Sequence, residues 1–150
     1  MAPLVLSLPD VAATRALGER LGRACFDGAV LLLSGPLGSG KTTLCQGLAC
    51  GLAVDGPVVS PTFIILAEHS GRLPLAHADL YRVEPGDLPG LALDERVGDG
   101  VWVVEWPDRA PTVWPSDRLE VELSDAGTGR SARLRATGPR HLALVEAARA

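Results

Sequence analysis

The sequence predicts an α/β domain of three layers, in which helices cover a mostly parallel sheet and the C-terminal part adds an antiparallel edge. Three observations favour this fold class. Residues 29–35, "AVLLLSG", form the continuous aliphatic run of a buried parallel strand. A glycine-rich stretch, "GPLGSGKTTL" (35–44), follows at once and passes into a helical pattern. Further apolar runs alternate with turns and helical segments along the rest of the chain.

Each expected element follows from a local pattern. An edge strand is expected at 5–8 and a helix at about 10–25, with Ser7 and Asp10 in a capping pattern and Pro9 in the first turn. After the strand at 29–35 we expect a helix at 41–52, a loop and strand at 56–66, and a strand at 73–83 that ends near Asp79. A short helix at 88–96 and a third buried strand at 100–106 follow. Alternating residues at 118–125 and 131–137 predict a hairpin with one wet face, the antiparallel edge, before a helix at 140–150.

Bulk properties limit the class of protein. With 150 residues and a hydrophobic content of 47%, residues 1–150 are expected to form one domain with a substantial core. The net charge of −4 argues against a large basic nucleic-acid surface, and no apolar run reaches the roughly 20 residues of a membrane helix. The chain opens without a secretory pattern, and its three cysteines have neither CxxC nor zinc-like spacing. We therefore expect a cytoplasmic protein with reduced, buried cysteines.

The glycine-rich stretch matches the motif G-x-x-x-x-G-K-[ST] through Gly35, Gly40, Lys41 and Thr42. The motif predicts binding of a nucleoside triphosphate and a P-loop NTPase-like fold, because glycines let backbone N–H groups approach phosphate and the helix N-terminus favours negative charge. Lys41, the only lysine among 14 basic residues, would reach the β- and γ-phosphates, and Thr42 would offer its hydroxyl to Mg²⁺. A structural glycine-rich turn that binds nothing is the alternative. The remaining residues expected to contact nucleotide in this loop are Leu37, Gly38, Ser39 and Thr43.

Two carboxylates close predicted strands, Asp79 after "LPLAHA" and Glu105 after "VWVV". Ligands of open α/β sheets bind beyond the carboxyl ends of the strands, and Mg²⁺ prefers hard oxygen ligands. Either acid could therefore bind the metal, directly or through water, while the other orients or deprotonates an attacking water. The alternative for each is a helix cap or an ion-pair partner.

Three further residues are candidates. Thr62 in "SPTF" (60–63) could sense the third phosphate, or it could belong to an ordinary Ser-Pro turn. If Trp106 continues the strand, its side chain would face away from Glu105. A position in the core is then expected, and a contact with nucleotide or with a partner is the alternative. His77 has no other His or Cys at ligand spacing, so we interpret it as a hydrogen-bonded structural histidine.

Four blocks, "GPLGSGKTT", "SPTF", "HADLYR" and "VEWPDR", resemble the TsaE family in their order and spacing, over nearly the whole chain from about Ser7 to Gly138. The resemblance implies a bacterial P-loop ATPase needed to make threonylcarbamoyladenosine at position 37 of certain tRNAs. It implies action in the cytoplasm with TsaD and TsaB, which transfer the threonylcarbamoyl group, so that tRNA is met through that complex. It also implies that ATP binding supports assembly with the TsaD–TsaB pair, and that slow ATP hydrolysis resets the complex for further cycles.

The resemblance also implies roles for single residues. Lys41 matches the phosphate lysine and Thr42 the magnesium hydroxyl, while Glu105 matches the second magnesium ligand. The remaining matches are Asp79 to an essential aspartate, Trp106 to a functionally sensitive tryptophan, Thr62 to a switch-like segment, Thr14 to the adenine side and Arg133 to an arginine near the nucleotide. The chain departs from the family pattern at Pro36, where an acidic residue is usual, and at "EHSG" (68–71).

Two other functions compete with ATP hydrolysis. A small-molecule kinase would need an acceptor pocket and a lid carrying arginines, yet the densest basic stretch, "GRSARLRATGPR" (129–140), alternates like a strand. A nucleotide-binding module without catalysis would not need two strand-end carboxylates. We therefore expect water to be the phosphate acceptor, with slow turnover alone because no arginine finger is evident in cis.

Overall fold

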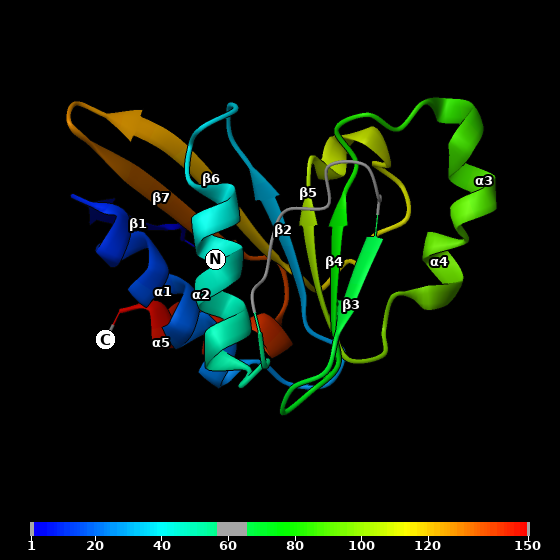
Figure 1. Ribbon diagram of the computed structural model, residues 1–150, viewed down its shortest axis with the longest axis horizontal. Helices are drawn as coiled ribbons and strands as arrows, with labels where there is room; N and C mark the ends of the chain where they lie inside the picture. The colour runs from blue at the N-terminus through cyan, green and yellow to red at the C-terminus, as the bar shows by residue number, and fades with distance from the viewer. Residues whose placement is uncertain (1, 57–65, 150) are drawn as a thin grey trace.

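The computed structural model describes residues 2–56 and 66–149, which form a seven-stranded mixed sheet with helices (Figure 1). The strand order is β1-β7-β6-β2-β5-β4-β3. In chain order the elements are β1 (Leu4–Leu8), α1 (Val11–Ala24), β2 (Val30–Ser34), α2 (Lys41–Gly51), β3 (Leu66–His69), β4 (Leu75–Asp79), η1 (Pro85–Asp87), α3 (Leu88–Leu91), α4 (Leu93–Arg96), β5 (Val101–Glu105), η2 (Pro107–Arg109), β6 (Leu119–Ala126), β7 (Gly129–Ala136), η3 (Pro139–His141) and α5 (Leu142–Ala148).

The centre of the sheet is parallel, as the sequence predicts, because β6, β2, β5 and β4 are parallel neighbours. The edges differ from the prediction. The expected C-terminal hairpin does not form the edge: β6 lies inside the sheet beside β2, and β1 is added outside β7 as an antiparallel neighbour. At the other edge β3 is antiparallel to β4. Alternation in a strand predicts one wet face but does not say which strands flank it, so the sequence pattern could not place β6.

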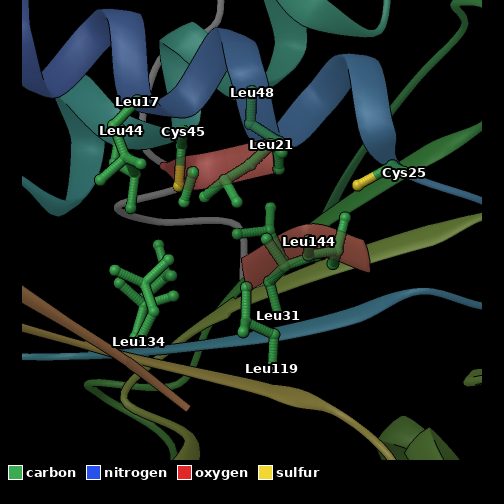
Figure 2. Close-up of a cluster of buried hydrophobic side chains, with 14 of the residues drawn as sticks. Leu17, Leu21, Cys25, Leu31, Leu44, Cys45, Leu48, Leu119, Leu134 and Leu144 are labelled. Atoms are coloured by element: carbon green, nitrogen blue, oxygen red, sulfur yellow. The ribbon is translucent and has the colours of Figure 1, made fainter. Parts of the chain in front are cut away.

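One face of the sheet carries the larger core, beneath α1, α2 and α5 (Figure 1). Leucines of the helices meet leucines of the strands there, with Cys45 among them (Figure 2). Leu31 and Leu33 of β2 both point to this side, as the two-residue period of a strand requires. The fully buried leucines of this core are Leu17, Leu21, Leu31, Leu33, Leu44, Leu48, Leu52, Leu75, Leu119, Leu123, Leu134 and Leu144.

Helices α1 and α2 approach each other at glycines. Gly18 and Gly22 of α1 face α2, and Gly47 and Gly51 of α2 face α1, each pair being four residues apart on one side of its helix. A Cβ on Gly47 would collide with the carbonyl oxygen of Arg15. This close approach of the two backbones fixes the position of α2 relative to α1, and therefore the position of the loop that precedes α2.

Replacing Gly47 with alanine should lower the free energy of unfolding by about 3 kcal/mol, because the helices must separate to admit the methyl group. Helix propensity alone would favour alanine by up to about 1 kcal/mol, so the sign of the change separates the two effects. Urea unfolding measures it. Gly86→Ala is the matched control, since a Cβ there has no neighbour within 4 Å. Equal stability of both variants would refute the close packing.

The other face of the sheet has a smaller core beneath α3, α4 and η2, built on residues such as Leu32, Trp102 and Val104. The short helix expected at 88–96 is divided in two, because Ala92 has a left-handed backbone with φ of 49°. This core does not extend over β6 and β7 in the described part of the chain, where Glu120, Glu122, Arg133 and Arg135 line an open hollow. The third layer of the predicted sandwich is thus partial.

The two chain ends are fastened to the fold by short polar contacts. Asp10, not Ser7, caps α1: its side chain accepts from the Ala13 backbone N–H at 2.8 Å, while Ser7 belongs to β1. Near the C-terminus, buried His141 accepts from the Val30 N–H at 3.0 Å through Nε2 and meets Asp117 through Nδ1 at 2.8 Å. Burial lowers the pKa of His141, although Asp117 opposes that shift.

The cysteines are free, but only Cys25 and Cys45 are buried, so the prediction is wrong for Cys50, which is exposed. The number and spacing of the cysteines could not predict that Cys50 of α2 is exposed to solvent. Among the helices of the described residues, none combines the length and the apolar character that crossing a bilayer requires.

Candidate functional site

The site lies where β2, β5 and β4 end at one edge of the sheet. Leu33 of β2 pairs with Glu105 of β5, and Glu105 pairs with Asp79 of β4. Two backbone bonds lock these ends together: the Trp106 N–H donates to the Leu33 carbonyl at 3.3 Å, and the Leu80 N–H donates to the Glu105 carbonyl at 3.0 Å. The predicted convergence of the two strand-end acids on the glycine-rich loop is therefore present.

The loop between β2 and α2 takes a conformation that its glycines permit. Gly35, Gly38 and Gly40 have φ values of 142°, 77° and 103°, in the region that side chains rarely adopt. A Cβ on Gly35 would also collide with the Leu123 carbonyl oxygen and lie 2.8 Å from the Ser39 hydroxyl. The loop delivers the chain into α2, an 11-residue helix whose first N–H groups point back into it.

Two polar groups in the loop fit a phosphate. Ser39 is 1% exposed, and its hydroxyl has no hydrogen-bond partner among the residues that the structure describes. Lys41 is 5% exposed, and its ammonium donates to the carbonyl oxygens of Gly35 and Pro36. Burial lowers the pKa of Lys41, and the carboxylates of Glu105 and Asp79 oppose that shift. A phosphate would supply the acceptor that Ser39 lacks and a counter-charge for the partly desolvated lysine.

The remaining loop residues lie around this cradle. Thr42 and Thr43 are half-buried in the first turn of α2, and Leu37 is exposed at the tip of the loop. Thr14 of α1 is buried and lies beside Gly40. Its methyl carbon is 3.6 Å from the position that a Cβ on Gly40 would occupy. Thr62 lies outside the described residues, together with most of the strand expected at 56–66.

Glu105 is buried and hydrogen-bonded to His77. Its Oε2 lies 2.7 Å from His77 Nε2, and the side chains are 4% and 0% exposed. The prediction of a hydrogen-bonded histidine is thus confirmed. Cys45 of α2 brings a third ligand-type atom within 4.8 Å of this pair, which residue spacing did not reveal. Burial, followed by the charges of Glu105 and Asp79, raises the pKa of Cys45 well above its ordinary value, so the thiol is protonated.

The chemistry of the thiol argues against a cation held by Cys45, His77 and Glu105 together. A metal-binding thiol must be deprotonated, whereas burial keeps the Cys45 thiol protonated. Sulfur is also a soft ligand, while Mg²⁺ prefers hard oxygen ligands.

Asp79 stands at the edge of the same group. It is half-buried, and its Oδ1 accepts from the Tyr81 backbone N–H at 3.0 Å, which fixes the turn after β4. Asp79 and Glu105 are register partners, and their side chains share the face that α2 covers. Two carboxylates and the Thr42 hydroxyl are hard oxygen donors that suit Mg²⁺, so the residues fit that ion.

Trp106 packs against the smaller core on the sheet face opposite α2, as the sequence predicts, and it also reaches the glycine-rich loop. Strand β5 ends at Glu105, and Trp106 has a left-handed backbone with φ of 58° that turns its ring toward the loop. The Lys41 ammonium lies 4.6 Å from the ring centroid, and the Tyr81 ring packs at 4.8 Å. Only the end of the strand was predicted one residue too far along the chain, and the following Pro107 was the signal of that end. Trp106 thus lies beside the loop lysine.

Fluorescence of Trp106 should change when ATP is added, because Lys41 must leave the ring to reach a phosphate. The measurement uses a variant with Trp102→Phe and Trp114→Phe, in which Trp106 is the only indole. Trp106→Phe with the other two tryptophans retained is the control and should lose the response. An unchanged spectrum under ATP concentrations that saturate binding by calorimetry would contradict this placement.

Arg133 is not brought to the loop. It lies on the sheet face opposite α2, exposed over a hollow of about 510 Å³ that Ser34 and Trp114 also line. Arg130, three residues earlier on β7, reaches the loop instead and donates to the Gly38 carbonyl at 3.0 Å. Sequence reasoning missed Arg130, because the spacing of the two arginines on one strand does not say which end of the strand lies near the loop.

Together, these features define an α/β protein with a glycine-rich loop and two acids at the carboxyl ends of its parallel strands. The family model described as "Threonylcarbamoyl adenosine biosynthesis protein TsaE" matches residues 8–133. The chain belongs to the TsaE family.

Relatives and a solved structure support the same assignment. The tRNA threonylcarbamoyladenosine biosynthesis protein TsaE of a Nostoc species is 42% identical over 128 residues, covering 81% of this chain and 78% of that protein. The protein of the same name from Bacillus subtilis is 40% identical over 136 residues, covering 89% and 85%. The crystal structure of Bacillus subtilis YdiB aligns with a TM-score of 0.83 and 32% identity, covering 98% of this chain and 94% of that one.

Proposed function

We propose that this protein is a P-loop ATPase, dependent on Mg²⁺ and slow when alone, that supports the formation of threonylcarbamoyladenosine on tRNA. The observation that carries the proposal is the convergence of a glycine-rich cradle, its lysine and two strand-end carboxylates at one edge of the sheet. The names of the relatives supply the pathway.

Each part of the site has a task in this proposal. The backbone N–H groups of the loop and the Ser39 hydroxyl would bind phosphate oxygens, and Lys41 would exchange its carbonyl partners for the β- and γ-phosphates. Thr42, with Glu105 or Asp79, would hold Mg²⁺, which neutralises charge on the phosphates when bound. The remaining carboxylate would orient or deprotonate the water.

Water as the acceptor agrees with the shape of the molecule. The basic stretch at 129–140 forms strand β7 and the η3 turn, so it supplies no helical lid of arginines over the loop. Arg130 contacts the loop at Gly38, and it is also paired with Asp125 at 3.2 Å. Such an arginine would need to leave its partner before it could stabilise a transition state, which favours slow turnover until a partner completes the site.

The resemblance assigns that partner role to TsaD and TsaB, with hydrolysis resetting their assembly after a cycle. This role lies in the cytoplasm, and tRNA would be met through the complex.

The deciding experiment measures ATP turnover by the purified protein, alone and with the TsaD–TsaB pair, while threonylcarbamoyl transfer to tRNA is followed. We expect slow phosphate release alone, and transfer over many cycles only when this protein and ATP are both present. Phosphate found on an added metabolite, with transfer unaffected by the protein, would overturn the proposal in favour of a kinase.

A further inference from the structure

His77 and Glu105 form a buried pair from two different sequence blocks, and the glycine-rich motif does not account for it. They lie on adjacent parallel strands, β4 and β5, where His77 is the register partner of Val103 and Glu105 lies two residues further on. Both side chains point to the face beneath α2, so this diagonal offset brings the ring to the carboxylate. His77 Nε2 and Glu105 Oε2 lie 2.7 Å apart.

The tautomer of the histidine follows from its surroundings. The Nδ1 atom is buried and has no hydrogen-bond partner in the described structure. A proton on Nδ1 would therefore be an unsatisfied buried donor, and the bare Nε2 would face a carboxylate oxygen. A proton on Nε2 instead donates to Glu105 Oε2 and leaves only an acceptor unpaired. The ring is thus an Nε2–H donor directed at one oxygen of Glu105.

We propose that His77 is a positioning residue that sets the orientation of the Glu105 carboxylate for Mg²⁺. The inference rests on the proposed function and deepens it, since it names the side chain that prepares the metal ligand. A carboxylate at a strand end can adopt several rotamers, and His77 selects one by holding Oε2. A histidine that only filled the core would need no carboxylate at this distance.

The role predicts an effect on the metal that is separate from the effect on the nucleotide. Lys41 and the loop contact phosphate without His77, so ADP binding in the absence of Mg²⁺ should not depend on the imidazole. The gain in ADP affinity on adding Mg²⁺ should depend on it. Partners that orient metal ligands are typically worth about 10- to 100-fold in metal affinity.

Calorimetric titration of ADP, with and without Mg²⁺, tests the role in three variants. His77→Leu and His77→Met fill the space without a donor, and His77→Gln restores an N–H donor. We expect Leu and Met to reduce the Mg²⁺-dependent gain about tenfold or more and to leave Mg²⁺-free affinity within about twofold, with Gln close to wild type. His141→Leu is the matched control: it removes the other fully buried histidine paired with a carboxylate and should keep the gain.

Each result decides the matter. Leu and Met variants that keep the full Mg²⁺ gain, or that lose Mg²⁺-free affinity by the same factor, overturn the positioning role while the proposed function stands. Wild-type protein without any Mg²⁺ gain overturns both. Should the donorless variants not fold, wild-type protein labelled with ¹⁵N-histidine still answers. Its His77 Nε2–H resonance must shift when Mg²⁺ joins the ADP complex while that of His141 does not, and an unmoved His77 signal overturns the role.

Discussion

Lys41→Ala should weaken ATP binding by about 100-fold, measured by calorimetry. The ammonium is the one lysine charge in the chain, and it lies inside the loop within reach of the carbonyl oxygens of Gly35 and Pro36. Two charge-assisted hydrogen bonds to phosphate, lost with no replacement, correspond to about 3 kcal/mol or more. Methyl in place of ammonium also leaves the neighbouring carboxylates without their cation, so phosphate meets a more negative site.

Two controls separate shape from charge. Lys41→Arg keeps the charge but places a broad planar group in a narrow cradle, so it should also lose most of the affinity. Arg149→Ala removes one surface cation near the C-terminus, where its side chain is 55% exposed, and should bind ATP as wild type does. Wild-type affinity in Lys41→Ala would remove the phosphate role from this lysine.

Glu105→Gln and Asp79→Asn should each lower ATP hydrolysis by about 100-fold or more while Mg²⁺-free ATP binding persists. Removing a metal ligand or a general base costs the chemical step, whereas the loop and Lys41 still hold the phosphates. The Gln side chain can still accept a hydrogen bond from the His77 N–H, so the substitution removes the negative charge of Glu105 and keeps the buried contact. Phosphate release over time, at saturating ATP, measures both variants.

The comparison variant is Glu122→Gln, which alters a glutamate of β6 on the opposite face of the sheet. It should leave turnover unchanged. Unaltered hydrolysis in both Glu105→Gln and Asp79→Asn would mean that the two strand-end acids are not the catalytic pair. A loss in only one of them would separate the essential acid from the accessory one.

Most of the elements, and the loop itself, could be predicted from local patterns. The aliphatic run of β2, the glycine-rich loop and the start of α2 depend on neighbours within a few residues, so the chain specifies them directly. The strand ends at Asp79 and Glu105 were likewise marked by a change from apolar residues to polar or turn residues. The approach of both acids to the loop followed from the general rule for open α/β sheets.

Other features depended on contacts between distant segments. His77 and Glu105 are 28 residues apart, and Arg130 and Gly38 are 92 apart, so no local pattern could pair them. The glycines of α1 and α2 allow close helix packing, which is visible only where the two helix backbones meet. Trp106 turned toward Lys41 because a left-handed residue ended the strand one position earlier than its apolar pattern implied.

The sequence alone therefore determined which groups are available: a glycine-rich loop with one lysine, and two acids at strand ends. Only the tertiary structure decided which side chains outside the motif contact these groups: His77 lies against Glu105, and Arg130, rather than Arg133, lies against the loop. The physical reason is that motif residues are placed by their own backbone turns and periodicity. Supporting residues are placed by strand order and register, which depend on packing across the whole sheet.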